Sequence, residues 1–110
     1  MSEKRRTAND HSINRLIEEW ARDRGLDTAD PTKQMLKLAE EFGELAEGLA
    51  KDKPEQVEDS IGDMYVVMTI LALQLGLDIE DCVQKAYNEI KNRRGKMING
   101  VFVKESDLKE

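Results

Sequence analysis

The stretch that decides the fold is "LAEEFGELAEG", residues 38–48, which carries glutamates at positions 40, 41, 44 and 47. Apolar residues recur around it at helical spacing, from Met35 to Leu49, so the sequence predicts an amphipathic helix here. Like charges three or four positions apart destabilise a helix by roughly 0.2–0.5 kcal/mol per pair. Either something offsets this repulsion, or the acids only form a solvated surface.

Capping residues predict where the first two helices begin and end. Ser12 is placed to cap a first helix, which Gly25 ends. Its apolar residues share one face: Ile13, Leu16, Ile17 and Trp20. Asp30 and Pro31 open a second helix that runs to about Ala50.

A third helix is expected to open at Pro54, after the break "KDKPEQ". It begins acidic and then becomes apolar through "MYVVMTILALQLGL", a run of 14 residues that is too short to span a bilayer. The run has little amphipathic character, so we expect it to be buried on most sides. A helix so buried in a small domain predicts a covering partner chain, and hence a homodimer or homotetramer.

The fourth helix is predicted from Asp78, its cap, to near Gly95, and Asn99-Gly100 between short apolar runs is a hairpin signal. The fold class predicted is therefore all-α, an oligomeric four-helix bundle with a short C-terminal extended or hairpin segment. The expected organisation is a flexible tail over residues 1–10, a helical domain over residues 11–97 and an extension over residues 98–110.

Composition limits the partners. The net charge of −6 argues against a nucleic-acid polymer, whose phosphates require Lys and Arg, but it permits a small anionic ligand bound through metal ions. No membrane partner is expected. One cysteine, Cys82, excludes an internal disulfide, and the polar start "MSEKRRTAND" lacks a secretory signal, so a reducing cytoplasm is the expected location.

Two acidic sets flank the break between the second and third helices. Glu41 and Glu44 come late in one helix, whereas Glu58, Asp59 and Asp63 come early in the next. A short break makes consecutive helices antiparallel neighbours, so the two sets should face each other. Facing carboxylates form an oxygen-only site of the kind that Mg²⁺ prefers, with Mn²⁺ as the other candidate. One histidine and one cysteine are too few for a zinc site.

The segments "LAEEFGELAEGLAK" and "EDSIGDMYVVMTILALQLGLDIEDCVQKAYNEIKNRRGKM" resemble the MazG-type, all-α nucleoside triphosphate pyrophosphohydrolases, from about Trp20 to Met97. The family pattern is Glu-Glu-x-x-Glu on one helix and Glu-x-x-Asp on the next. The residues that match are Glu40, Glu41, Glu44 and Asp63. Ser60 stands where the family has the second Glu, which leaves the metal set open; Asp59 or Glu58 would stand in for it.

The resemblance implies hydrolysis of a nucleoside triphosphate to the monophosphate and pyrophosphate in an oligomeric enzyme. Mg²⁺ would bridge the carboxylates and the phosphates, and water would attack the α-phosphorus, helped by a metal or by a glutamate such as Glu40. The metal set implied is Glu41, Glu44, Asp63 and Asp59, and the catalytic glutamates are Glu40 and Glu41.

The fourth helix is expected to complete the site. Asn88, Lys91 and Arg94 follow one another at three-residue spacing, which places an amide and two cations on one helical face. The resemblance implies that these residues contact the nucleotide and that Trp20 stacks on its base. Each also has a structural alternative: the cations complement the helix dipole, and Trp20 is an ordinary core residue.

Three other functions stay open. The first is phosphoribosyl-ATP pyrophosphohydrolase activity, which a substrate panel would reveal. The second is a catalytically weak relative, marked by Ser60, that binds a nucleotide or a partner protein. The third is a purely structural helical module, which would show no thermal shift with Mg²⁺ and nucleotide.

Overall fold

The computed structural model describes residues 12–108, so the expected tail over residues 1–10 lies outside the described residues. The chain divides into two compact units between Ile79 and Glu80. Each unit is described by itself. The helical unit ends with the start of α5, and the second unit holds the rest of α5 and the strands.

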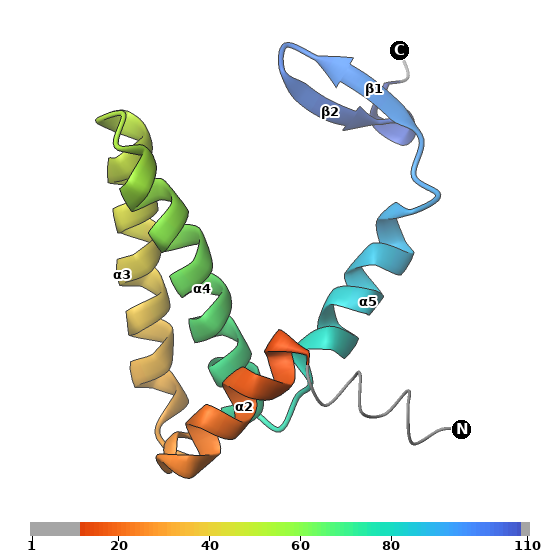
Figure 1. Cartoon of the computed structure of the whole chain (residues 1–110). Helices are drawn as coiled ribbons and strands as arrows, with labels where there is room; N and C mark the ends of the chain where they lie inside the picture. Colours follow the sequence, from red (N-terminus) through yellow and green to blue (C-terminus); the bar gives the residue numbers. More distant parts are fainter. Residues whose placement is uncertain (1–11, 109–110) are drawn as a thin grey trace. The chain divides into compact units, whose positions relative to one another are not determined.

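The helical unit contains α2 (Ile13–Asp23), the 3₁₀ turn η1 (Leu26–Thr28), α3 (Pro31–Ala50) and α4 (Pro54–Gln74). α3 and α4 run antiparallel and side by side, and α2 packs against α4 (Figure 1). The predicted caps are confirmed: the Ser12 side chain accepts from the N–H of Arg15, and Asp30 accepts from the N–H of Thr32 at 2.9 Å. Local sequence therefore sets where these helices begin.

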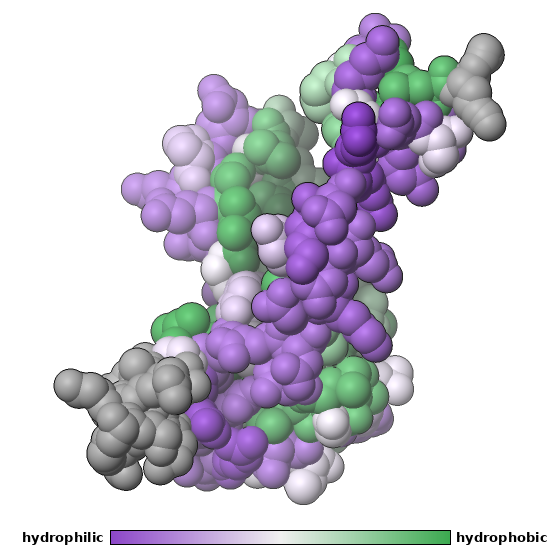
Figure 2. All heavy atoms as spheres, turned by 90° about the vertical axis from the view of Figure 1, so that its right-hand side faces the viewer, coloured by the Kyte–Doolittle hydropathy of each residue, from purple (hydrophilic) through white to green (hydrophobic). Residues whose placement is uncertain are grey.

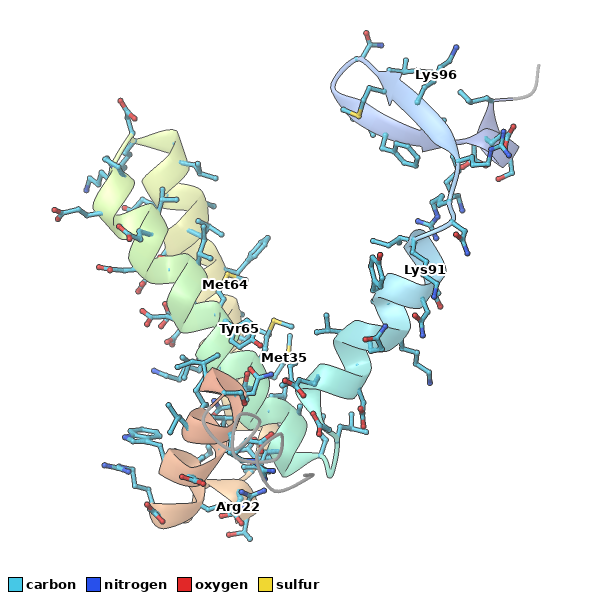
Figure 3. All side chains as sticks on the ribbon, turned by 45° about the vertical axis from the view of Figure 1, so that its right-hand side comes forward. Arg22, Met35, Met64, Tyr65, Lys91 and Lys96 are labelled. Atoms are coloured by element: carbon cyan, nitrogen blue, oxygen red, sulfur yellow. The ribbon has the colours of Figure 1, made fainter. Side chains whose placement is uncertain are left out.

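The core of this unit joins α2 to the C-terminal half of α4. Ile17, Ala21 and Ile70 are buried together, with Leu26 and Leu73 packed against them. Polar contacts join the same elements. The Tyr65 hydroxyl of α4 (labelled in Figure 3) donates to Oδ1 of the buried Asn14. The Gln74 amide donates to the carbonyl of Leu26 at 2.9 Å.

α3 and α4 approach each other closely at Gly48, near the break. A Cβ at this position would lie 3.0 Å from Cγ2 of Val57 and 3.2 Å from its backbone nitrogen. The turn itself is fixed by the N–H of Lys53, which donates to the carbonyl of Gly48 at 2.8 Å, and by Asp52 with φ of 54°. The absence of a side chain at position 48 thus sets the spacing of the two helices that carry the acids.

The apolar run of α4 is less buried in a single chain than predicted. Val67, Thr69, Ile70 and Ala72 are buried, but Val66, Met68 and Leu75 are exposed. Within one chain, α2 and α3 cover only part of the circumference of α4. Burial of the remainder by a partner chain stays a prediction.

The second unit contains most of α5 (Ile79–Ile90), then β1 (Gly95–Ile98), β2 (Val101–Lys104) and the 3₁₀ turn η2 (Glu105–Asp107). The hairpin prediction is confirmed: Asn99 and Gly100 have φ of 51° and 80°, as a two-residue turn of this kind requires. The expectation that the helix runs to near Gly95 is wrong, because α5 ends at Ile90.

The fold is all-α apart from this C-terminal hairpin, as predicted. Over residues 12–108, none of the helices combines the length and the hydrophobicity needed to cross a membrane.

Replacing Gly48 with leucine should lower the free energy of unfolding by about 1–3 kcal/mol, because the new side chain would force α3 away from Val57. Gly43→Leu is the matched control on the same helix, since nothing lies within 4 Å of a Cβ at that position. Urea unfolding, monitored by circular dichroism, measures the free energy of unfolding of the two variants. Equal stability of the two variants would contradict the close approach at Gly48.

Candidate functional site

The acidic residues of α3 and α4 meet as the sequence predicted, with Glu41 at the centre. Burial raises the pKa of the Glu41 carboxyl above its ordinary value, and repulsion from Glu44 and from Asp63 adds to the increase. Lys37, one turn earlier on α3, acts in the opposite direction. Since Glu44 and Asp63 come from two different helices, the antiparallel pairing brings the two acidic sets within electrostatic range.

One oxygen of Glu41 lacks a partner. Its Oε1 atom is buried and has no hydrogen-bond partner among residues 12–108. A buried carboxylate oxygen without a donor is unfavourable unless a proton or a cation satisfies it. The donor set of Glu41, Glu44 and Asp63 is made only of carboxylate oxygen, which suits a hard divalent cation. Their chemistry is that of the Mg²⁺ ligands that the sequence predicts, and the metal itself stays a prediction.

Three of the predicted acids lie at the surface of the helices. Glu40, Asp59 and Asp63 are exposed. Within the described part of the chain, no three acidic, histidine or cysteine side chains converge closely enough to hold a metal ion. Glu41, Glu44 and Asp63 are therefore electrostatic neighbours rather than a closed coordination shell.

Ser60 lies on the inner side of α4, where its residue is only 1% exposed. Asp59 and Asp63, by contrast, lie on the solvent side of the same helix. A glutamate at position 60 would have to bury its carboxylate, which is unfavourable without a compensating cation. The serine is thus compatible with close packing in this fold, and Ser60→Glu would test packing as much as chemistry.

Gln56 is a site neighbour that the sequence did not reveal. Its amide nitrogen lies 2.9 Å from the backbone carbonyl of Glu44 and 2.9 Å from Oε1 of Glu47, so it joins the start of α4 to the end of α3. Lys51 lies 3.0 Å from the other oxygen of Glu47, and these two contacts lower the pKa of Glu47. Glu47 is therefore paired with a cation and an amide, whereas one oxygen of Glu41 has no partner.

The residues predicted to bind the nucleotide on α5 do not form the expected helical face. Asn88 is on α5, where it accepts from Gln84, but Lys91 and Arg94 follow the end of the helix. The helix stops because the chain turns towards β1: the backbone N–H of Arg93 donates to Ile90, and Arg94 lies 3.7 Å from Glu105. Figure 3 shows Lys91 beside the end of α5. The expectation of a shared helical face is wrong.

Trp20 is neither a core residue nor a fully open platform. It is 47% exposed, and the guanidinium of Arg24 lies 4.2 Å from the centroid of its ring. The ring borders a hollow of about 290 Å³ that Leu16, Ile17 and Val66 also line. A base that stacked on Trp20 would use the face that Arg24 leaves open.

Comparison with known proteins is consistent with this arrangement. A family model described as "MazG nucleotide pyrophosphohydrolase domain" matches residues 29–98, more than half of the chain. This range includes α3, α4, α5 and β1. No solved structure gives a significant match.

Two curated proteins are similar to the chain. An uncharacterised 18.2 kDa protein of Haemophilus phage HP1 is 57% identical over 63 residues, which cover 56% of this chain and 39% of the phage protein. The nucleoside triphosphate pyrophosphohydrolase/pyrophosphatase MazG of Thermotoga maritima is 36% identical over 86 residues, 78% of this chain and 32% of that protein. The chain therefore spans well under half of either relative.

Glu41→Gln should stabilise the folded chain near neutral pH. A carboxyl whose pKa is raised on folding stabilises the fold only while it is protonated, and it loses that stabilisation as the pH rises through its folded pKa. Glutamine keeps the neutral form at every pH. Thermal unfolding at about pH 7 and at about pH 3 measures the effect. The increase in melting temperature of Glu41→Gln over the unmodified chain should appear only at the higher pH.

The exposed residue Glu40 provides the control on the same helix. The change in melting temperature caused by Glu40→Gln should differ less between the two pH values than the change caused by Glu41→Gln. If the two variants respond alike, the crowding at Glu41 is contradicted.

Proposed function

Since the chain belongs to the MazG nucleotide pyrophosphohydrolase family, we propose that it hydrolyses a nucleoside triphosphate to the monophosphate and pyrophosphate in a Mg²⁺-dependent reaction. The observation that carries the proposal is Glu41, a carboxylate with a buried unpaired oxygen beside two further acids. Its surroundings favour a divalent cation, and such a cation allows an acidic chain to bind a triphosphate.

The acids divide into two roles. Glu41, Glu44, Asp63 and Asp59 would hold Mg²⁺, or Mn²⁺ in its place, and a cation held there would supply neutralisation of the phosphate oxygens. Glu40 is exposed on α3 beside this set and accepts the proton of the attacking water. The water oxygen bonds to the α-phosphorus as the bond to pyrophosphate breaks.

The substrate contacts come from cations and an aromatic ring. Lys91 and Arg94 are exposed and meet the phosphates, and the amide of Asn88 is close to them in the chain. Trp20 receives the base on the ring face that Arg24 does not cover. The compartment that supplies such nucleotides is the cytoplasm, where we place the protein.

A homodimer or homotetramer is part of the same proposal. Large apolar side chains are exposed on α2, α3, α4 and α5, among them Leu16, Phe42, Ile61 and Tyr87. Exposed apolar surface spread over so many elements is typical of a protein-protein interface rather than of a free monomer. The side of α4 that stays exposed in one chain, with Val66 and Met68, would lie at the centre of this interface.

Pyrophosphate release from a panel of nucleotides is the first test. Canonical and modified NTPs and dNTPs, with phosphoribosyl-ATP included, are incubated with Mg²⁺ or Mn²⁺. We expect metal-dependent release that falls by roughly a hundredfold or more in Glu41→Gln. The best substrate then defines the base and sugar preference.

Glu47→Gln is the matched control for that experiment, because Glu47 lies on the same helix but is paired with Lys51 and Gln56. It should retain activity close to that of the unmodified chain. Equal losses in Glu41→Gln and Glu47→Gln would contradict the proposed site. Metal-independent release would contradict the role of Mg²⁺.

A second candidate is a catalytically weak protein that binds a nucleotide or a partner. Two observations favour it: Ser60 replaces a family carboxylate, and residues 12–108 contain no closed set of three ligands. Calorimetry separates the candidates. Binding of a non-hydrolysable triphosphate with Mg²⁺, without release from any member of the panel, would identify the weak relative.

Sedimentation equilibrium tests the oligomer. We expect a mass of two or four chains at micromolar concentration, and a shift towards the monomer in Phe42→Ser or Ile61→Ser, whose side chains are exposed in a single chain. A single-chain mass at every concentration would contradict the oligomer without bearing on the hydrolysis assay.

A further inference from the structure

The C-terminal hairpin is unusually apolar for an exposed two-stranded element. Met97, Ile98, Val101 and Phe102 are all 40–62% exposed. In the register of the hairpin, Met97 pairs with Phe102 and Ile98 pairs with Val101. An isolated two-stranded hairpin is at best marginally stable in water, so this one requires a further surface to pack on.

The two faces of the hairpin differ in chemistry. Side chains alternate along each strand, so Met97, Phe102 and Lys104 share one face, and the other face holds branched aliphatic residues with a lysine: Lys96, Ile98, Val101 and Val103. The ring of Phe102 lies over Gly95, where a Cβ would come within 2.8 Å of Cζ. The first face, named here the aromatic face, thus presents a ring, a thioether and a lysine.

The hairpin and the segment before it are strongly basic. Residues 91–104 contain five cations and no acid: Lys91, Arg93, Arg94, Lys96 and Lys104. The chain as a whole has a net charge of −6, so the remainder is more acidic than the total indicates. Figure 2 shows hydrophobic surface on the hairpin beside strongly hydrophilic residues. A matching surface would be apolar with an acidic rim.

The helical unit offers such a surface where α3 turns into α4. A hollow of about 430 Å³ has Leu49, Val57 and Ile61 among its lining residues. Leu49 and Ile61 are more than half exposed. Asp52 and Glu58 also line the hollow, with Lys53 between them in the chain, so the acids outnumber the cation.

We propose that the aromatic face of the hairpin docks into this α3–α4 hollow on a second copy of the chain. Phe102 and Met97 fill the apolar floor, and Lys104 meets the acidic rim. Two copies related by a two-fold axis make this contact twice, because each copy carries both the hairpin and the hollow. The proposal rests on the homo-oligomer proposed above and extends it by naming the contact.

Two variants of the same hairpin test which face docks. In Met97→Ser/Phe102→Ser the dissociation constant of the oligomer should rise tenfold or more, since both side chains leave an apolar site. Ile98→Ser/Val101→Ser changes the same number of apolar residues on the opposite face and should change the constant by less than about threefold. Sedimentation equilibrium measures both constants, with circular dichroism to establish that the helices remain.

Equal weakening by the two double variants would overturn the proposal, because it would reflect loss of the hairpin fold rather than of one face. No weakening by either would also overturn it, while the unmodified oligomer and its pyrophosphate release would stand. If the unmodified chain is monomeric, both the proposed oligomer and the proposed docking are contradicted, and the hydrolysis result is unaffected.

Crosslinking identifies the partner surface. Phe102→p-benzoylphenylalanine, which puts the probe on the aromatic face, is prepared in ¹⁵N-labelled chains, and these are refolded together with unlabelled chains that lack the probe. Irradiation should link the labelled hairpin to unlabelled peptides from residues 48–61. Links confined to labelled chains, links to the hairpin of the other copy, or no links at all would each overturn the proposal.

Discussion

The close approach of α3 and α4 is the constraint on which the rest of the site depends. It is made possible by Gly48, whose missing side chain lets Val57 pack directly against α3. Because the two helices are joined by a short turn, residues late in one lie opposite residues early in the other. Glu41 is therefore half-buried next to Glu44 and within electrostatic range of Asp63. The helices bring like charges together, and a cation at this position would relieve the resulting repulsion.

The same geometry explains why the acids are not equivalent. Glu47 has Lys51 and Gln56 as partners, which lower its pKa, whereas Glu41 has a buried oxygen without a donor and a raised pKa. Both residues belong to one run of glutamates on one helix. They differ in part because α4 places the Gln56 amide beside Glu47 but the Asp63 carboxylate near Glu41. A carboxylate that is already paired has less to gain from a metal ion than one that is not.

Helix boundaries and the acidic centre were predictable because they depend on local signals. Ser12, Asp30 and Pro54 mark helix starts that the structure confirms, and Asn99-Gly100 marks the hairpin turn. The end of α5 was not predictable from charge spacing: Lys91 and Arg94 suit a helical face, but the chain turns at Ile90 to begin the strand pair. The pairing of β1 with β2 lies beyond the helix in sequence, and the charge spacing of residues 88–94 does not reveal it. Gln56 was missed for a similar reason, since its partners are nine and twelve residues away.

The short turn between α3 and α4 also bears on how the chain folds. Contacts across a helical hairpin join residues close in sequence, so little loop entropy opposes them and they form early. The bond between Asn14 and Tyr65 joins residues 51 positions apart and closes a much longer loop. We therefore expect the acids of α3 and α4 to be brought together before α2 is fixed. Their repulsion then acts on the rate of folding as well as on the final stability, so a divalent cation that relieves it would accelerate folding.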